Sequence, residues 1–393
     1  MSHFDTVPMR RGTNSHKWDL DCGPDVIAMS VADADFVTAP FIREALSECA
    51  RRDVFGYTFW PTSARQLTVD WLERRHGWRP SGNAVLHCSG VLTGLRATLA
   101  SVLNSGEAVV VTTPAYPPFA HLPQSNGYQV YDSALVTKEG RYTIDYDSLE
   151  IQLRRPEAKA MILCNPHNPV GRVYDRTELE TVVCLCVRHG VTIISDEIHS
   201  DIVMFGNKHV PIASLSSEAA SNTVTLVSPS KTFNIPGLPT AAVICEVPEL
   251  LARIDSAIKA TGNYHPDPFA VAAYEAALSV GGSYVTSMNE YLEANLQYAC
   301  DFLASRCEPL VAQRPEGTYL LWIDCRDLGL ADDDLRSFFG HRAKLNLHSG
   351  RLFGAEGSGF MRLNAACPRS VLACALNGIE TALRTRSQER RTA

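Results

Sequence analysis

The chain has 393 residues, 45% hydrophobic and 20% charged, a composition typical of globular proteins and a length sufficient for two domains with large cores. Its formal charge of −7 gives no electrostatic reason to expect nucleic acid or an anionic membrane as a partner. The first ten residues lack the apolar region of a secretory signal, and no apolar run approaches the roughly 18 residues of a membrane-spanning helix. We therefore expect a cytoplasmic protein.

From residue 84 onward, short apolar runs alternate with segments of helical periodicity. The apolar runs predict strands, in chain order, at residues 84–88, 108–112, 160–164, 191–195, 223–227 and 241–247. The segments between them predict helices at residues 91–103 and 177–189, and a helix or turn at residues 116–125. Strands rich in Val, Ile and Leu on both faces, separated by helices, predict an α/β domain with a mostly parallel sheet flanked by helices.

The pattern changes beyond residue 282. We expect helices at residues 286–305, 332–342 and 370–385, and extended segments at residues 318–324 and 360–364. The polar tail, residues 384–393, is expected to fray. These elements predict a smaller α+β domain at residues 283–393, which residues 1–49 would join, beside a large domain at residues 50–282.

The twelve cysteines are scattered along the chain and form no Cys-x-x-Cys motif. No histidine lies at zinc-like spacing from a pair of cysteines. We expect free thiols in a reducing compartment and no metal site.

Ligands of open α/β sheets bind at the carboxyl ends of strands, so the residues that follow each strand are candidates for a site. After residues 84–88 comes S-G-V-L (89–92), whose small residues would let a helix N-terminus approach a phosphate, although plain packing explains such a turn equally well. Tyr116 follows the second strand within T-P-A-Y-P-P-F, where an ordinary aromatic anchor is the simpler explanation. Asn168 follows the third strand between two Asn-Pro dipeptides, which would fix an irregular loop and aim its amide.

Three further residues continue this series. Asp196 ends a buried strand, where a carboxylate needs a cationic partner. His199 follows it without a second metal ligand at helical spacing. Lys231, one of only seven lysines, follows an apolar run and has no acidic neighbour in the sequence.

Together these residues supply what pyridoxal 5′-phosphate requires. The aldehyde of this cofactor needs a lysine, its ring nitrogen a carboxylate, its ring an aromatic neighbour and its phenolic oxygen a donor. Its phosphate needs backbone N–H groups and hydroxyls, which residues 89–92 and the serines beside Lys231 would provide. We therefore predict pyridoxal 5′-phosphate as the cofactor.

The order of the motifs carries a resemblance over nearly the whole chain. They are V-A-D-A-D-F (31–36), F-G-Y-T (55–58), S-G-V (89–91), T-P-A-Y-P-P-F (113–119), C-N-P-H-N-P-V-G (164–171), S-D-E-I-H-S-D (195–201), S-P-S-K-T-F-N (228–234) and M-R-L-N-A-A-C-P-R (361–369). The chain resembles the fold-type I pyridoxal-phosphate enzymes of the class I/II aminotransferase superfamily. Within it, the motifs D-E-I-H, S-K-T-F-N and A-D-A-D-F resemble those of the cystathionine β-lyase-like C–S lyases.

The resemblance implies roles for the residues around the cofactor. Lys231 would form the Schiff base and act as the catalytic acid and base. Asp196 would pair with the ring nitrogen, Asn168 would bond the phenolic oxygen with His199 nearby, and Tyr116 would stack on the ring. The phosphate would be held by Gly90, Val91, Leu92, Ser228 and Ser230.

On the substrate side, the resemblance implies that Arg362 clamps the α-carboxylate of an amino acid by a bidentate contact. A surface ion pair is the plainer alternative, but the apolar run around Arg362 disfavours it. Asp33 would bind substrate as well. Tyr57 would reach the phosphate or the substrate of the neighbouring subunit and take part in catalysis, which implies a homodimer with active sites at the interface.

The chain departs from the family pattern in two respects. Residues 232–239 contain no phosphate-binding arginine, as is common in the lyase-like branch. Residues 348–354 lack the expected proline before Gly350, and residues 281–285 lack the expected tryptophan near Tyr284. These two segments border the substrate in the family, so we expect an unusual amino acid in the pocket.

The leading hypothesis is α,β-elimination of a cysteine S-conjugate or a cystathionine-like amino acid to thiol, pyruvate and ammonia. An aminotransferase, or a specialised biosynthetic enzyme that couples the same cofactor to decarboxylation or oxidation, is an open alternative. A binding protein without turnover is disfavoured because the N-terminus offers no DNA-binding extension. A dinucleotide-dependent dehydrogenase is disfavoured because no G-x-G-x-x-G follows the first strand.

Overall fold

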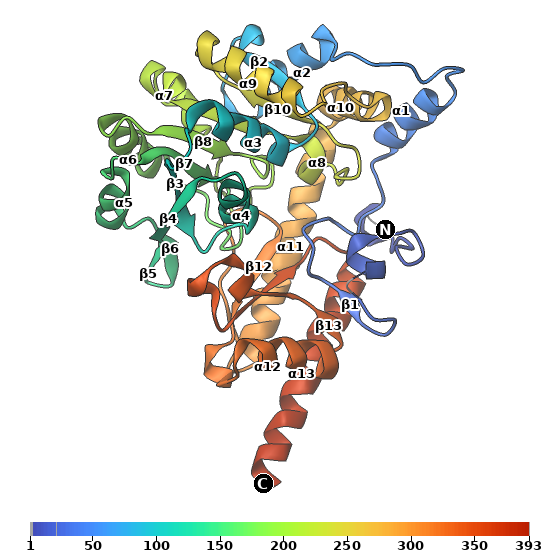
Figure 1. Ribbon diagram of the computed structural model, residues 1–393. Helices are drawn as coiled ribbons and strands as arrows, with labels where there is room; N and C mark the ends of the chain where they lie inside the picture. The colour runs from blue at the N-terminus through green and yellow to red at the C-terminus, as the bar shows by residue number, and fades with distance from the viewer. Residues whose placement is uncertain (1–2, 21, 393) are drawn as a thin grey trace.

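The computed structural model describes residues 3–20 and 22–392. A large α/β body occupies the upper part of the molecule, and a smaller module lies below it (Figure 1). The long helix α11 (Gly282–Arg306) runs from one to the other. No helix in the described ranges combines the length and the apolar character needed to cross a membrane.

A seven-stranded sheet forms the centre of the large body. Its strands follow the order β2 (Val85–Cys88), β10 (Ala241–Ile244), β9 (Thr223–Val227), β8 (Thr192–Asp196), β7 (Ala158–Cys164), β3 (Ala108–Thr113) and β4 (Gln129–Ala134). Only β10 runs antiparallel to its neighbours in this sheet. The predicted mostly parallel sheet is thus confirmed. The carboxyl ends of β2, β9, β8, β7 and β3 all lie at the same edge of the sheet.

Helices cover both faces because alternate strand residues point to opposite sides. Val109 and Val111 of β3 join an apolar cluster with α3 (Val91–Val102), α4 (Pro118–Ser125) and α9 (Pro248–Ala260). Val110, between them, joins a second cluster with α5 (Tyr146–Leu153) and α6 (Arg176–Arg188). The strands are therefore buried on both faces, as their continuous apolar sequences predict.

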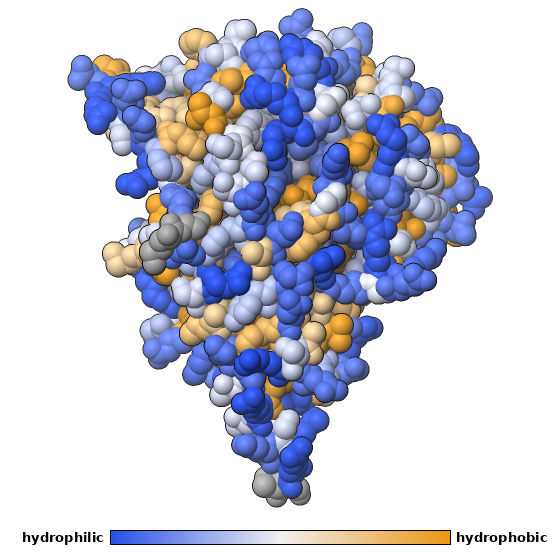
Figure 2. Space-filling model, turned by 180° about the vertical axis from the view of Figure 1, so that it is seen from behind, coloured by the Kyte–Doolittle hydropathy of each residue, from blue (hydrophilic) through white to orange (hydrophobic). Residues whose placement is uncertain are grey.

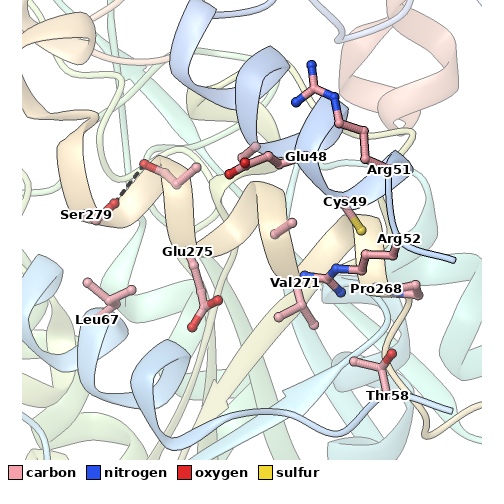
Figure 3. A pocket seen from close by; sticks show the side chains of 13 residues that line it. Glu48, Cys49, Arg51, Arg52, Thr58, Leu67, Pro268, Val271, Glu275 and Ser279 are labelled. Carbon is pink, nitrogen blue, oxygen red and sulfur yellow. Dashed lines mark hydrogen bonds between the residues drawn. The ribbon is translucent and has the colours of Figure 1, made fainter. Parts of the chain in front are cut away.

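A third apolar cluster lies behind the helix that carries Lys231. Phe233 and Ile235 pack there against α1 (Pro40–Ala50), α2 (Thr62–His76) and α10 (Pro268–Val280). The chain between α1 and α2, residues 51–61, projects from the body (Figure 1). A surface pocket of about 520 Å³ lies beside this loop, with α1, α2 and α10 around it (Figure 3).

The smaller module is built on a four-stranded antiparallel sheet. Its order is β11 (Val311–Ala312), β12 (Leu320–Asp324), β15 (Phe360–Asn364) and β14 (His348–Ser349). α11, α12 (Asp332–Ser337) and α13 (Arg369–Thr392) complete it, and β1 (Ile27–Ala28) pairs in parallel with β13 (Leu345–Asn346). The N-terminal segment therefore contacts this module through β1 and the large body through α1. The boundaries at residues 49 and 282 stay predictions.

Three features differ from the expectations. β4 and the hairpin of β5 (Val136–Lys138) and β6 (Arg141–Thr143) carry too many polar residues to be recognised in the sequence. The helix expected at residues 332–342 changes to π-helical geometry at Phe338–Arg342. The expectation of a frayed tail is wrong, since α13 continues to Thr392. Arg386 stabilises this last part by donating to the carbonyl of Leu328, and Glu389 by pairing with Arg342.

Candidate active site

Lys231 lies on the short helix α8 (Pro229–Thr232), directly after β9. The hydroxyl of Ser228 begins this helix by accepting a hydrogen bond from the Ser230 N–H and donating one to the Thr240 carbonyl. Lys231 Nζ donates to the carbonyl oxygen of Ala32 at 2.6 Å. Burial lowers the pKa of Lys231 to about 8, although the Asp33 and Asp196 carboxylates raise it. A substantial fraction of this amine is therefore neutral near physiological pH.

Asp196, the last residue of β8, presents a buried carboxylate close to this amine. Burial raises the pKa of Asp196 to about 6, and the N–H of Ile198, which donates to Oδ1 at 3.0 Å, and the charge of Lys231 lower it. Within the described residues, Asp196 forms no ion pair at salt-bridge distance. A buried carboxylate with so little compensation fits a cationic partner such as a protonated ring nitrogen.

Arg362, in the middle of β15, is a second buried cation, and only 2% of its surface is exposed. Its Nη1 donates to Asn168 Oδ1, and its Nη2 donates to the Ser30 carbonyl and to His348 Nδ1, each at 2.8 Å. Its Nε finds no acceptor in the described part of the chain. Burial lowers the pKa of Arg362 to about 10, so the guanidinium remains charged. The alternative of a surface ion pair is wrong, because Arg362 is buried and all three of its acceptors are uncharged.

Tyr116 and His199 lie near these charges. The ring of Tyr116 meets Phe119 edge to face at 5.5 Å, and its hydroxyl pKa is raised by burial and by Asp196. The ring of His199 meets Tyr319 at 5.8 Å. Burial, then Lys231 and Arg362, lower the pKa of His199 to about 3, so this imidazole is neutral. The described ranges contain no group of three or more His, Cys, Asp or Glu side chains that could hold a metal ion.

The N-terminus of α3 forms an open cradle at the same edge of the sheet. Cys88, at the end of β2, and Val227, at the end of β9, both lie beside the first residues of β10. Gly90 precedes the helix, and a Cβ added to it would meet no atom within 4 Å. Val91 and Leu92 are the first two residues of the helix. Their N–H groups donate no backbone hydrogen bond in the described part of the chain. A helix N-terminus with open space in front of it fits a phosphate.

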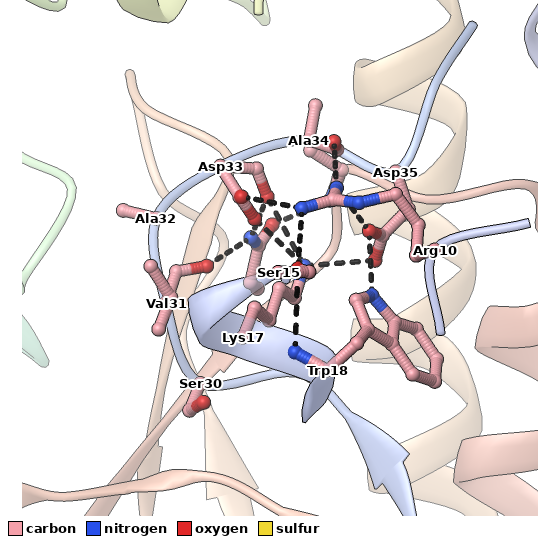
Figure 4. Close-up of polar contacts among 12 residues, drawn as sticks. Arg10, Ser15, Lys17, Trp18, Ser30, Val31, Ala32, Asp33, Ala34 and Asp35 are labelled. Carbon is pink, nitrogen blue, oxygen red and sulfur yellow. Dashed lines mark hydrogen bonds and ion pairs between the residues drawn. The ribbon is translucent and has the colours of Figure 1, made fainter. Parts of the chain in front are cut away.

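Asp33 belongs to a network of charged side chains from the N-terminal segment (Figure 4). Its Oδ2 accepts from Arg10 Nη2 at 2.7 Å, and its Oδ1 lies 3.5 Å from Lys17 Nζ. Asp35 accepts from Lys17 at 2.8 Å, from Arg10 at 2.7 Å and from the indole N–H of Trp18 at 2.9 Å. The Lys17 side chain is 1% exposed. The sequence around residues 10 and 17 contains no pattern that predicted this network.

We call residues 30–36 the strap, because this segment connects Lys231 and the residues that follow α8 to the smaller module. Asn234 accepts from the N–H of Ala34 and donates to the carbonyls of Ala34 and Phe36. Asn364 of β15 donates to the carbonyls of Val31 and Asp33 at 2.7 and 2.6 Å. The strap thereby places Lys231 and Arg362 on either side of one site.

Tyr57 does not lie in this site. It is 94% exposed on the loop between α1 and α2, and its ring lies 5.0 Å from that of His265. The single chain therefore brings together Lys231, Asp196, Asn168, Tyr116, His199, Arg362 and the α3 cradle, but not Tyr57. The roles of all these residues stay predictions. His348, Phe353 and Tyr319 also border Arg362 or Ala32; the sequence indicated the segment 348–354 as a whole but neither these contacts nor Tyr319.

The residues present fit pyridoxal 5′-phosphate on structural grounds. An amine with a lowered pKa and a buried carboxylate with no ion pair lie within electrostatic reach of each other. An open helix N-terminus follows a strand of the same sheet edge. The Ser228 hydroxyl already accepts from the Ser230 N–H and donates to the Thr240 carbonyl, so among the two predicted serine ligands Ser230 is the one with a free hydroxyl in the described residues.

Comparisons with known proteins agree with this geometry. The family model for aminotransferase class I and II matches residues 24–379. The cystathionine β-lyase PatB of Bacillus subtilis is 39% identical and the protein MalY of Escherichia coli 35% identical, over 97% and 98% of this chain and 100% and 99% of theirs. Crystalline cystalysin from Treponema denticola, which contains pyridoxal 5′-phosphate, superposes with a TM-score of 0.95 at 30% identity, covering 98% of this chain and all of its own. The resemblance inferred from the motifs is confirmed, and the chain belongs to the class I and II aminotransferase family.

Proposed function

We propose that the chain is a pyridoxal 5′-phosphate-dependent C–S β-lyase, which eliminates a thiol from cysteine S-conjugates or cystathionine-like amino acids. The observation that carries the proposal is a partly neutral Lys231 that lies within electrostatic reach of both the Asp196 carboxylate and the buried Arg362 guanidinium. Two relatives named cystathionine β-lyases cover 97% and 91% of the chain, at 39% and 30% identity, which supports this reaction.

The cofactor would be held by the cradle at Gly90, Val91 and Leu92, by Ser230 and by Lys231. Bound pyridoxal 5′-phosphate supplies a ring that stabilises negative charge developing at the substrate Cα. Asp196 would keep a proton on the ring nitrogen, because the negative charge of its carboxylate stabilises the protonated, cationic ring. Asn168 has its oxygen occupied by Arg362, so its N–H₂ group is the part available to the phenolic oxygen.

Arg362 would bind the α-carboxylate of the substrate. Asn168, Ser30 and His348 occupy three of its five N–H donors, and two donors remain for the ligand. Neutral Lys231 would then take the proton from Cα, because its lowered pKa makes it a base at physiological pH. Loss of the thiolate from Cβ and addition of water yield thiol, pyruvate and ammonia.

The test is to incubate the cofactor-loaded protein with cystathionine and a panel of cysteine S-conjugates while measuring thiol and pyruvate. We expect equal amounts of both products, at a rate that added 2-oxo acids do not increase. Lys231→Ala is the matched control and should lower the rate at least a thousandfold. Absence of thiol and pyruvate across the panel contradicts the proposal, and a requirement for a 2-oxo acid indicates an aminotransferase instead.

We further propose a homodimer in which Tyr57 of the partner subunit completes each site. The loop between α1 and α2 carries Val54, Phe55, Tyr57 and Phe59, all more than half exposed. Seen from behind, apolar side chains reach the surface in the upper part of the molecule, to which this loop belongs (Figure 2). Exposed apolar side chains on a projecting loop are characteristic of a surface that another chain covers.

The protein would act in the cytoplasm. Cys184 and Cys374 are exposed free thiols. Exposed thiols persist where the compartment is reducing.

A further inference from the structure

Residues 348–354, which depart from the family pattern, form two sides of the Arg362 site. β14 pairs with β15 in a register that places His348 directly opposite Arg362. The His348 Nδ1 lies 2.8 Å from Arg362 Nη2, and the ring of Phe353 lies 4.7 Å from the guanidinium carbon. Directly opposed residues of an antiparallel pair have adjacent side chains, so the strand register itself produces this contact.

The contact fixes the protonation state of His348. A guanidinium can only donate hydrogen bonds, so the Nδ1 of His348 must be the acceptor and carry no proton. The single proton of the neutral ring then lies on Nε2. Burial, followed by the charges of Arg362 and His16, lowers the pKa of His348 to about 3, which is consistent with a neutral ring.

The uncharged acceptor has a specific consequence for Arg362. Both hydrogens of Nη2 are used, one by the Ser30 carbonyl and one by His348, so the guanidinium plane cannot rotate freely. A carboxylate at position 348 would hold the plane equally well but would cancel the positive charge. A neutral imidazole orients the guanidinium and leaves its charge available to an incoming anion.

We propose that His348 is a positioning residue, whose unprotonated Nδ1 orients the Arg362 guanidinium for the carboxylate of the substrate. This inference rests on the proposed function only in that the ligand is an amino acid. It assigns a role in substrate recognition to the segment whose sequence fits the family least.

The first test compares His348→Leu with His348→Asn in the cofactor-loaded protein. The two replacements have nearly the same shape, but only Asn offers an acceptor oxygen near the position of Nδ1. We expect His348→Leu to raise the KM for a cysteine S-conjugate about 10- to 100-fold with kcat changed less than about threefold, because one hydrogen bond to a charged group is lost. His348→Asn should recover most of the loss. Equal KM values for the two variants overturn the inference.

His341 provides a matched control, because it is an exposed histidine of the same module. His341→Leu should leave the KM unchanged. A general effect of losing a histidine from this module would instead raise the KM in both leucine variants and contradict a specific role for His348.

Two further measurements do not depend on turnover. Nitrogen-15 NMR of the histidine-labelled protein should show His348 protonated at Nε2 alone down to about pH 5, and a proton on Nδ1 overturns the inference. Calorimetric binding of L-alanine, which has a carboxylate but no leaving group, should weaken about 10- to 100-fold in His348→Leu and less in His348→Asn. If the S-conjugates do not react but alanine still distinguishes the variants, the lyase proposal fails and the positioning role stands. If turnover is normal and alanine binds both variants alike, the positioning role fails.

Discussion

Two buried cations in the site are kept in different states by their surroundings. Burial lowers the pKa of both, to about 10 for Arg362 and to about 8 for Lys231. A guanidinium at that value remains charged at physiological pH, whereas an amine exchanges readily between its two forms. Arg362 is thereby suited to hold an anion, and Lys231 is suited to accept and return a proton.

The lowered pKa of Lys231 predicts a pH-dependent cost to stability in the cofactor-free protein. The unfolded chain binds this proton up to about pH 10.5, whereas the folded chain releases it near pH 8, so burial of the charged amine is unfavourable below pH 8. The cost should be relieved as the pH rises from 8 to 10.5.

Lys231→Met removes the titrating group and keeps an unbranched side chain only one heavy atom shorter. The stability of this variant relative to the parent should be greatest near pH 7 and fall by up to about 3 kcal/mol by pH 10. Urea unfolding of both cofactor-free proteins at several pH values measures this difference, in which the other titrating groups cancel. A difference that does not change with pH contradicts the assignment.

Some residues of the site could be predicted from the sequence and others could not. Lys231, Asp196 and Asn168 each follow an apolar strand, and that local pattern was sufficient to select them. The contact of His348 with Arg362 depends on the register of two strands, and that of Lys17 with Asp35 on the path of a loop. Such contacts form only in the folded chain, so no local sequence pattern predicts them.

The strap is the element that organises the site, although it contains no regular secondary structure. Lys231 on the large body and Asn364 on the smaller module both donate to its carbonyls, and Arg10 and Lys17 neutralise its carboxylates. An irregular segment must satisfy its backbone polar groups with partners from elsewhere. Apart from a hydrogen bond from the Asp33 N–H to the Val31 carbonyl, the strap therefore depends on tertiary contacts for its conformation.

Because the strap depends on these contacts, Asp35→Asn should strongly lower the stability of the protein. The substitution leaves the fully buried Lys17 without its closest counter-charge, which lies at 2.8 Å, and should lower the free energy of unfolding by about 3–5 kcal/mol. Adding Lys17→Met should recover part of that loss, because removing both charges costs less than stranding one.

Asp333→Asn is the matched control for this substitution. Asp333 is an aspartate whose side chain is 98% exposed, and its replacement should change the free energy of unfolding by less than about 0.5 kcal/mol. Chemical unfolding measures the free energy of unfolding of the three variants relative to the parent. A loss below about 1 kcal/mol for Asp35→Asn would mean that the network does not hold the strap.

At the scale of elements, the strands of the large sheet were the most predictable part. β3, β7 and β9 are buried at nearly every position and rich in apolar residues, because helices cover both of their faces. β4 lies at the edge of the sheet with only Ser133 buried, and its sequence resembles that of a loop. The reversed direction of β10 follows from how the chain returns after α8, which strand composition does not encode.

At the scale of the whole molecule, the projecting loop between α1 and α2 exposes several large apolar and aromatic side chains. Phe59 is 77% exposed, and Tyr57, to which the family resemblance gives a catalytic role, is 94% exposed. A homodimer accounts for both observations, because it would cover the apolar side chains and carry Tyr57 to the site of the partner.

Phe59→Asp should therefore disrupt association without unfolding the subunit. A buried charge without a partner is costly at an interface, whereas Phe59 contributes little to the core of its own chain. Analytical ultracentrifugation should show a dimer for the parent and a shift toward monomer for the variant, with a parallel loss of lyase activity.

Ile151→Asp is the control, since Ile151 is 53% exposed on α5, far from this loop in the fold (Figure 1). It should leave the sedimentation of the protein unchanged. A parent that sediments as a monomer, or a Phe59→Asp variant that remains dimeric, contradicts the proposed interface.

The contacts that the strap makes with the site pass through its main chain. The carbonyl oxygens of Ser30 and Ala32, and not their side chains, receive the hydrogen bonds from Arg362 and Lys231. Alanine substitution at Ser30 would therefore be tolerated and Ala32 has no side chain for it to remove, even though both residues contact the two principal cations of the site. Replacing the peptide bond after Ala32 by an ester weakens that carbonyl as a hydrogen-bond acceptor. A backbone change of this kind would test whether Lys231 depends on the Ala32 carbonyl, which side-chain substitutions cannot do.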